Sequence, residues 1–316
     1  PWHCMAATVI KTVNLTKRYG TLVALSNLNL EIQEGDCFGF IGPNGAGKTT
    51  TIKILATLLQ PTWGEARICD YVVGYQSRQI RPLIGYVPDY FGAYEDMVVQ
   101  EYLEFFAAAY NINGAARTKI VNDVLELTDL GYKRDALVDG LSRGMKQRLS
   151  IARVLVHDPK VLLLDEPAGN LDPRARIEMR ELLKELRRMG KTILISSHIL
   201  PELADLCNTI GIIERGELLY SGPVSDILRR ARTGLVLHVG VASNQEQAAA
   251  LLSQDPNVVN VSASNGYMEV CLKDGVKDWS FVPTRLVQSG FKLTLLKEEE
   301  VNLETAFMRL TKGMVQ

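Results

Sequence analysis

The chain has 316 residues, of which 47% are hydrophobic and 22% are charged, and its formal net charge is -1. This composition is that of a globular protein long enough for a large core and a second domain, and it gives no general basis for binding nucleic acid. The 5 cysteines are dispersed without C-x-x-C pairing, which argues against a disulfide framework or a zinc site and favours a reducing compartment.

The cytoplasm is the expected location. No apolar run reaches the ~18 to 20 residues that a membrane-spanning helix needs, and the first residues lack the pattern of a signal peptide. Because the chain opens on proline, we expect Met5 to be the native start.

The first predicted elements are two antiparallel strands, Thr8 to Val13 and Leu22 to Ile32, in which apolar and polar residues alternate. The polar segment Thr16 to Gly20 between them is expected to form a loop. Tyr19 lies in this segment. Its ring either packs on the sheet or stacks on the adenine of a nucleotide bound by the motif that follows.

A phosphate-binding loop is predicted between a strand at Cys37 to Ile41 and a helix at Thr50 to Leu59, which Pro61 stops. The spacing matches G-x-x-x-x-G-K-[ST], in which glycines let backbone N–H groups turn inward on a polyphosphate at a helix N-terminus. We expect Lys48 to reach the β- and γ-phosphates and the Thr49 hydroxyl to hold Mg²⁺. The cofactor-binding residues expected here are Gly42, Pro43, Asn44, Gly45, Ala46, Gly47, Lys48, Thr49 and Thr50.

After this helix the hydrophobic period changes. Short strands are predicted at Glu65 to Cys69 and Leu83 to Val87. Helical spacing then appears at Val98 to Tyr110 and Ala115 to Leu130. Residues 95–140 are therefore expected to form a helical insert in an α/β domain.

The segment Leu141 to Arg148 leads into an amphipathic helix at Leu149 to Val156, which places Ser142 and Gly144 at a helix N-terminus. Such an end favours an anion, and serine is a good N-cap. A capped helix with its basic residues in solvent is the alternative interpretation.

An apolar strand from Val161 ends in two acids, Asp165 and Glu166. A buried parallel strand has this composition, and its carboxyl end lies where doubly wound sheets bind ligands. We expect Asp165 to hold Mg²⁺ through its water shell and Glu166 to orient and deprotonate the attacking water. A further strand at Thr192 to Ser196 carries His198 to the same edge, where it is a candidate to contact the γ-phosphate.

Together these residues resemble the nucleotide-binding subunit of an ATP-binding cassette (ABC) transporter, over about residues 8–230. The resemblance implies an α/β fold, namely a P-loop NTPase ABC ATPase core with an antiparallel β subdomain and a helical subdomain. It also implies roles for individual residues: Tyr19 as the adenine-stacking aromatic, Gly42 to Thr49 as the Walker A motif, Leu141 to Met145 as the signature motif, Val161 to Glu166 as Walker B, Asn170 to Asp172 as the D-loop and His198 as the switch histidine.

The resemblance further implies a Mg²⁺-dependent ATPase on the cytoplasmic face of the membrane, acting with a separate transmembrane permease subunit. Members of the family hydrolyse ATP in a head-to-tail dimer, so Ser142 and Gly144 of one copy would complete the site built on Lys48 of the other. Arg143 and Met145 replace the commonest glycine and glutamine of the signature, as in the branch that exports drugs, lipids and polysaccharides. Export is therefore expected.

Asp89 departs from the family pattern, because it stands where the Q-loop glutamine is expected after Ile84 to Pro88. A glutamine donates and accepts hydrogen bonds, whereas an ionised aspartate only accepts and adds negative charge. We expect Asp89 to reach the metal through water and to slow turnover. A weakly hydrolysing ATP switch is one alternative. A soluble ABC ATPase outside transport is another, although a single cassette without a heptad run argues against it.

Three aromatic residues follow Asp89 closely: Tyr90, Phe91 and Tyr94. In this family the segment lies near the permease, so they are expected either to anchor that interface or to pack the helical insert.

The chain beyond Gly222 has a different organisation. Predicted elements follow the order βαββαβ, which indicates a small ferredoxin-like α+β domain, with a last helix near Leu303 to Leu310. We expect an ATPase domain over residues 5–230 and an accessory domain over residues 234–316, joined at Arg229 to Gly234. Dimer stabilisation or regulation is the role that the resemblance suggests for the accessory domain.

Overall fold

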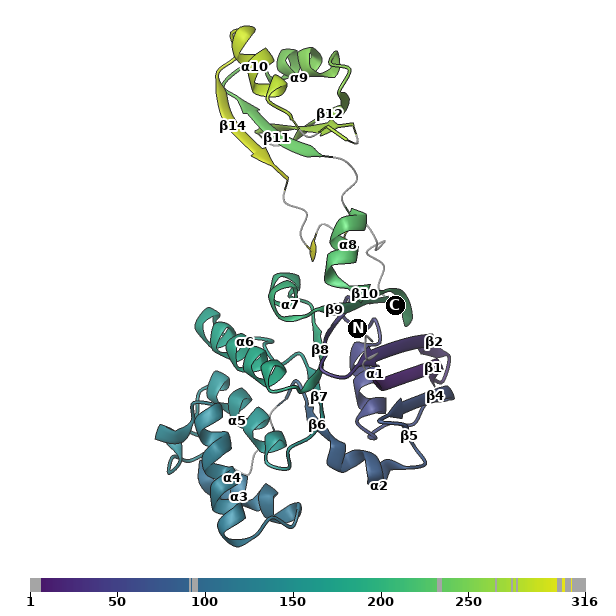
Figure 1. The fold of residues 1–316 in the computed structure, drawn as a ribbon, viewed down its shortest axis with the longest axis vertical. Helices are drawn as coiled ribbons and strands as arrows, with labels where there is room; N and C mark the ends of the chain where they lie inside the picture. The colour runs from purple at the N-terminus through teal and green to yellow at the C-terminus, as the bar shows by residue number, and fades with distance from the viewer. Residues whose placement is uncertain are drawn as a thin grey trace, which may run out of the picture. The chain divides into compact units, whose positions relative to one another are not determined.

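The computed structural model describes residues 7–90, 92, 96–231, 235–264, 266–273, 275–276, 278–299, 303–304 and 308. Figure 1 follows these residues from the N-terminal strands to the C-terminal sheet. The chain divides into two compact units, and the division falls between Val224 and Ser225. Most of the last predicted helix, residues 232–234 of the predicted linker, Phe91 and Tyr94 lie outside the residues described.

A four-stranded antiparallel sheet opens the first unit, with strand order β2-β1-β4-β5. Its inner face carries alternate apolar side chains, because successive side chains of a strand point to opposite faces. In the second strand, for example, Leu28, Leu30 and Ile32 are buried. The strands are β1 (Thr8–Tyr19), β2 (Leu22–Gln33), β4 (Trp63–Ile68) and β5 (Tyr71–Val72).

The second sheet of this unit is six-stranded, in the order β10-β9-β3-β8-β7-β6. Neighbouring strands are parallel except for β10, which pairs antiparallel to β9. The three central strands are buried along their whole length, as their continuous apolar sequences predict. The strands are β3 (Cys37–Ile41), β6 (Ile84–Val87), β7 (Val161–Asp165), β8 (Thr192–Ser197), β9 (Thr209–Glu214) and β10 (Glu217–Pro223).

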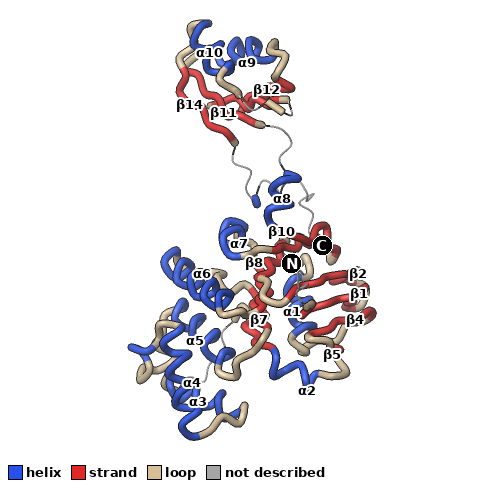
Figure 2. The backbone as a smooth tube through the Cα atoms, viewed as in Figure 1, coloured by secondary structure: helices blue, strands red, loops and turns tan. Residues whose placement is uncertain are grey.

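Helices surround the six-stranded sheet (Figure 2). The first helix packs between the two sheets, and residues from both sheets and from this helix form one hydrophobic core. The helices of the first unit are α1 (Lys48–Leu55), α2 (Ser77–Ile80), α3 (Val99–Ala109), α4 (Gly114–Leu127), α5 (Arg143–Leu155), α6 (Pro173–Arg188) and α7 (Leu200–Leu206), with short 3₁₀ turns at Arg81–Leu83 and Gly131–Lys133. Helix α8 (Val224–Ala231) begins at the division and belongs otherwise to the second unit. This arrangement confirms the predicted α/β core with an antiparallel β part and a helical part.

Two local predictions were wrong. The segment Thr16 to Gly20 is not a loop, because β1 continues to Tyr19 and pairs there with Leu22. The chain reverses only at Gly20, whose φ of 59° suits a glycine turn. The first helix ends at Leu55, well before Pro61, because Thr57 adopts a φ of 61°.

The second unit has the predicted βαββαβ order. Its four-stranded sheet has the order β12-β13-β11-β14, and each neighbouring pair is antiparallel. This is the split βαβ arrangement of ferredoxin-like folds. The two helices and the sheet share a separate hydrophobic core. The elements are β11 (Val236–Val241), α9 (Gln245–Ser253), β12 (Val258–Ser264), β13 (Tyr267–Leu272), α10 (Phe281–Gln288) and β14 (Leu293–Glu298).

His157 ties the helical part to the six-stranded sheet in its neutral form. Its Nε2 donates to the Ile84 carbonyl oxygen over 2.9 Å, and its ring stacks on Tyr110 with centroids 3.9 Å apart. Burial lowers the pKa of His157 from its ordinary value of 6.5, and the Ile84 hydrogen bond opposes the shift only in part. The unfolded chain therefore binds the proton more readily than the folded chain does.

We predict that the first unit loses stability as the pH falls below about 6.5, where an unfolded histidine takes up its proton. His157→Gln keeps a donor for the Ile84 carbonyl but does not titrate, so its melting temperature should fall less steeply over the same range. Calorimetric melting curves across this pH range measure both slopes. Equal slopes for the two proteins would contradict the assignment.

Candidate functional site

The phosphate-loop sequence forms a tight turn between β3 and α1. A Cβ at Gly42 would lie 2.3 Å from the Ile213 carbonyl oxygen, and one at Gly47, whose φ is 110°, would lie 2.6 Å from Leu25. Only glycine fits at either position. The conformation of the loop therefore depends on glycine at both positions.

Lys48 is the first residue of α1 and is buried. Its Nζ donates to the carbonyl oxygens of Gly42 at 2.6 Å and Pro43 at 3.1 Å, which curls the side chain back over the loop. Burial lowers the pKa of Lys48, while the charges of Glu166 and Asp165 raise it. The ammonium group is thus partly stripped of water and held close to carboxylates.

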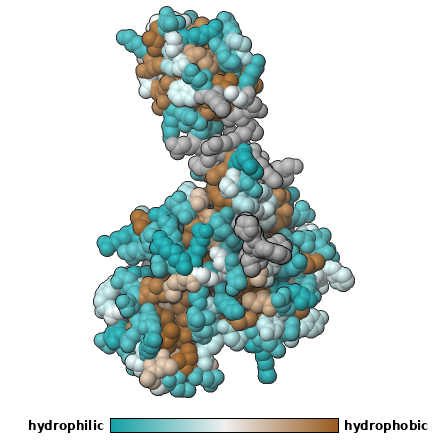
Figure 3. Space-filling model, in the orientation of Figure 1, coloured by the Kyte–Doolittle hydropathy of each residue, from teal (hydrophilic) through white to brown (hydrophobic). Residues whose placement is uncertain are grey.

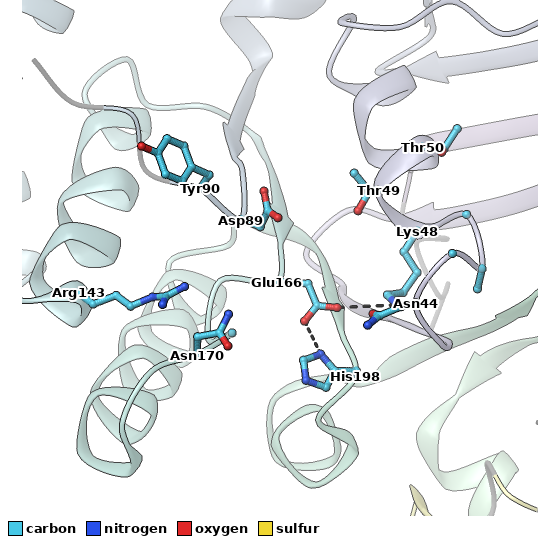
Figure 4. A pocket seen from close by; sticks show the side chains of 14 residues that line it. Asn44, Lys48, Thr49, Thr50, Asp89, Tyr90, Arg143, Glu166, Asn170 and His198 are labelled. Atoms are coloured by element: carbon cyan, nitrogen blue, oxygen red, sulfur yellow. Dashed lines mark hydrogen bonds and ion pairs between the residues drawn. The ribbon is translucent and has the colours of Figure 1, made fainter. Parts of the chain in front are cut away.

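Glu166, which follows β7, contacts residues that follow β3 and β8 at the same edge of the sheet (Figure 4). Its Oε1 lies 3.7 Å from Lys48 Nζ, and its Oε2 lies 2.5 Å from His198 Nδ1. The backbone of Glu166 has a φ of 51°, which is uncommon for a side chain of this kind. Its N–H donates to the Ser196 carbonyl and hydroxyl oxygens, so the neighbouring strand holds this conformation.

Asp165 is buried beneath the loop. Its Oδ1 accepts hydrogen bonds from the hydroxyls of Thr49 at 3.1 Å and Ser196 at 2.7 Å. Its Oδ2 is buried and has no hydrogen-bond partner among the residues described. Burial raises the pKa of Asp165, the two hydroxyl hydrogen bonds lower it, and the charges of Asp89 and Glu166 raise it further.

The oxygen atoms of Thr49 and Asp165 are the kind of ligand that Mg²⁺ prefers, and the unpartnered Oδ2 leaves an acceptor for one of its waters. Among the described residues, no group of three or more His, Cys, Asp or Glu side chains could hold a metal ion by itself. The arrangement therefore fits a metal that receives its other ligands from water and from a bound phosphate.

These side chains surround a hollow of about 610 Å³, much of whose wall is polar. Figure 4 shows Lys48, Glu166 and His198 pointing toward one another across it. The residues that line the hollow are Asn44, Gly45, Ala46, Gly47, Lys48, Thr49, Thr50, Asp89, Tyr90, Arg143, Glu166, Gly169, Asn170 and His198. Most of the predicted site residues thus lie together.

Tyr19 lies apart from this group. It is the last residue of β1, is 48% exposed and does not line the hollow. The Nζ of Lys17 lies 5.2 Å from the centre of its ring. The ring is partly exposed, and it belongs to a strand end and not to the predicted loop.

Ser142 caps α5 as predicted, since its Oγ accepts from the Met145 N–H over 3.3 Å. Gly144 has a packing role that the sequence did not indicate. A Cβ at Gly144 would lie 2.7 Å from the Cβ of Ala175 in α6, so the two helices approach closely at this point. Neither Ser142 nor Gly144 lines the hollow of its own subunit.

Five residues of the site were not among the individual site residues predicted from the sequence. Tyr90, Arg143, Gly169 and Asn170 line the hollow, and Ser196 holds both Asp165 and Glu166. Ser196 is the residue before the last of β8, and only the register of β7 with β8 reveals its partners.

Within the described residues, no helix combines the length and the hydrophobicity needed to span a membrane. Comparison with known proteins places the site in a family. Residues 25–169 match the family model described as ABC transporter.

Two relatives and one solved structure illustrate the extent of the similarity. The bacitracin transport ATP-binding protein BcrA of Bacillus licheniformis is 35% identical, over 97% of this chain and 98% of its own. A Nod factor export ATP-binding protein I of Burkholderia orbicola is 41% identical, over 69% of this chain and 72% of its own. A dimeric ATP-binding cassette in a post-hydrolysis state with ADP and Pi superposes with a TM-score of 0.61 at 29% identity, over 68% of this chain and 98% of its own.

The similarity to BcrA extends through both units, and the site contains the phosphate loop, the buried aspartate and the glutamate that the family motifs require. The chain therefore belongs to the ATP-binding subunits of ABC transporters.

Proposed function

We propose that this ATPase subunit powers export through a separate transmembrane permease, on the cytoplasmic face of the membrane, as a head-to-tail dimer with a second copy of itself. The observation that carries the proposal is Glu166, held between Lys48 and His198 at the mouth of the hollow. A carboxylate in this position is a suitable base for a water molecule attacking a phosphate.

In this proposal Lys48 binds the β- and γ-phosphates of ATP in exchange for the Gly42 and Pro43 carbonyls. Backbone N–H groups of the loop and the N-terminus of α1 add positive potential at the same place. Tyr19 stacks on the adenine from the end of β1. Binding thus relies on groups that the fold has already positioned.

Thr49 and Asp165 hold Mg²⁺, supported by their shared hydrogen bond and by the unpartnered Asp165 Oδ2. The ion, when bound, neutralises charge on the phosphates. Asp89 faces the same hollow and would reach the metal through water.

Glu166 accepts the proton of the attacking water. Lys48 and His198 each hold one oxygen of its carboxylate, so its orientation is restricted before the water arrives. His198 lies at the carboxyl end of β8 with a partly exposed ring, from which it also contacts the γ-phosphate. Much of the rate acceleration then comes from positioning and charge stabilisation.

The position of the signature residues supports dimerisation. Ser142 is exposed at the N-terminus of α5 and does not line the hollow of its own chain, which leaves it accessible to a second copy. The similar cassette with ADP and Pi was solved as a dimer, which supports this arrangement.

Export is supported by the names of the relatives, one a Nod factor export protein and another a bacitracin transport protein. A separate groove of about 260 Å³ offers a place for the permease. Tyr86, Phe106 and Tyr110 line this groove. Tyr90, which follows Tyr86 closely in the sequence, is exposed. Figure 3 shows hydrophobic side chains gathered over this helical part of the first unit.

We also propose that the ATPase domain covers residues 5–230, with its helical subdomain at about 95–140, and that residues 234–316 form an accessory domain. The separate core of the second unit supports an independent role such as stabilising the dimer.

Lys48→Ala should reduce ATP affinity and lower turnover on the order of 10²- to 10³-fold, because the main cation facing the phosphates is lost. Binding of a fluorescent ATP analogue and Mg²⁺-ATPase assays measure the two effects. Lys53→Ala, which removes a lysine from the same helix outside the hollow, is the matched control. Normal affinity and rate in Lys48→Ala would reject the assigned phosphate site.

Glu166→Gln should bind ATP as wild type does but hydrolyse it on the order of 10²- to 10³-fold more slowly, because the amide cannot accept the proton of the water. Analogue binding and single-turnover hydrolysis separate the two steps. Wild-type turnover in this variant would show that another group is the base.

Asp89→Gln should raise the ATPase rate and lower the Mg²⁺ concentration needed for half-maximal rate, because one negative charge beside Asp165 is removed. Steady-state rates over a Mg²⁺ titration test this. An unchanged rate and an unchanged Mg²⁺ dependence would show that Asp89 has no part in the metal shell.

A further inference from the structure

The two residues of the contact between Glu166 and His198 each lead into a helix. His198 follows β8, and α7 begins two residues later at Leu200. Glu166 follows β7, and α6 begins at Pro173, where Asp172 caps its N-terminus. Figure 1 shows α6 and α7 side by side, and the two helices are in contact. A shift of α7 against α6 would therefore carry His198 away from Glu166.

Helix α7 is too short to hold its position by itself. It has 7 residues, and no side-chain hydrogen bond caps its N-terminus. Isolated helices shorter than ~12 to 15 residues are marginal in water, so such a helix depends on its packing. Leu200, Leu203 and Leu206 are buried on its apolar side. The contacts of its polar side with α6 then decide how far it can slide or turn.

Three arginines of α6 contact α7. We call them the arginine stripe: Arg176, Arg180 and Arg187. Their spacing of four and seven residues returns each to the same side of an α-helix. Arg180 Nη1 lies 3.3 Å from Asp205 Oδ2, and Arg187 Nη1 donates to the Leu206 carbonyl oxygen over 3.0 Å. The stripe thus contacts the C-terminal half of α7 twice, once at its last residue.

Glu202 is the contact of the stripe in the first turn of α7. Its Oε1 lies 3.9 Å from Arg176 Nε, and its side chain is 21% exposed. Burial raises the pKa of Glu202, while the charges of Arg176, Arg180 and His198 lower it. A partly buried carboxylate needs positive charge nearby to stay ionised, and the stripe supplies that charge.

These contacts lie directly behind the site. Two members of the stripe and Glu202 line a small cavity of about 20 Å³ together with Pro167 and Ser197. Pro167 is the residue after Glu166, and Ser197 is the residue before His198. The stripe therefore reaches the backbone that carries both members of the contact.

The ordinary explanation is that these are ion pairs near the surface, and a single pair of that kind contributes little to stability. Here three contacts join the same two helices from one side of α6. Together they restrict the movement of α7 along its length, which one exposed pair does not do.

We propose that the arginine stripe is a positioning device for ATP hydrolysis. By fixing α7 against α6 it keeps His198 beside Glu166, and so keeps the base oriented toward the attacking water. The inference rests on the proposed function, since it takes Glu166 as the base and His198 as its partner. The three arginines are outside the lining of the nucleotide hollow, so they act through α7 and not by touching the nucleotide.

The test compares kcat with the KM for ATP in Mg²⁺-ATPase assays of the full-length chain. Arg180→Glu places a carboxylate opposite Asp205 and should push α7 away from α6. We expect kcat to fall ~3- to 10-fold, while the KM and the affinity for a non-hydrolysable analogue stay within about twofold of wild type. Arg188→Glu is the matched control, since Arg188 pairs with Glu185 of its own helix at 2.9 Å.

Two further variants separate the ion pair from damage to the fold. Arg180→Glu combined with Asp205→Arg restores a pair of opposite direction, so its kcat should return toward wild type. Arg180→Gln should give a smaller loss of the same kind, and it replaces Arg180→Glu if that variant does not fold. Melting temperatures check each protein.

A double-mutant cycle with His198→Ala identifies the route of the effect. His198→Ala should lower the rate by itself. Arg180→Glu should then lower it no further, because the residue through which α7 acts is missing. Single-turnover hydrolysis measures these low rates.

A kcat of Arg180→Glu equal to that of the control would overturn the inference. So would a loss by the same factor in the wild-type and His198→Ala backgrounds, or a charge swap that folds normally but recovers nothing. A wild-type rate in Glu166→Gln or in His198→Ala would instead reject the roles given to these residues in the proposed function. The two kinds of failure are therefore distinguishable.

Discussion

The contact of Glu166 with Lys48 on one side and His198 on the other depends on the order of strands in one sheet. The segments that follow β3, β7 and β8 carry these three residues, and the three strands are neighbours and parallel. Their carboxyl ends therefore meet at one edge, where ligands of such sheets bind. A buried lysine is costly in free energy unless a negative charge lies close, and Glu166 and Asp165 supply that charge.

The features that could be predicted well are those with a distinctive pattern in a short stretch of sequence. The phosphate loop requires glycines at fixed spacing, and a continuous apolar strand ending in Asp165 and Glu166 indicates a buried parallel strand. The structure has the predicted strand and helix on either side of the loop, and it has the predicted buried strand. The βαββαβ order of the second unit was also readable, because each short element has its own hydrophobic period.

What could not be predicted depends on contacts between distant segments. Ser196 holds Asp165 and Glu166 only because β7 and β8 pair in one particular register. Gly144 is required where α5 crosses α6 at Ala175, a contact that neither helix reveals alone. Tyr19 continues a strand despite its polar neighbours, because pairing with β2 outweighs their low strand propensity.

The central claim is that this chain hydrolyses ATP at a site that two copies complete together. The most direct measurement is the Mg²⁺-ATPase rate per subunit against protein concentration. The account predicts a rate that rises with concentration and levels off when the dimer is fully formed, because Ser142 of one copy must meet the hollow of the other. A substantial rate that stays constant down to concentrations at which size exclusion in ATP shows only single copies would contradict it.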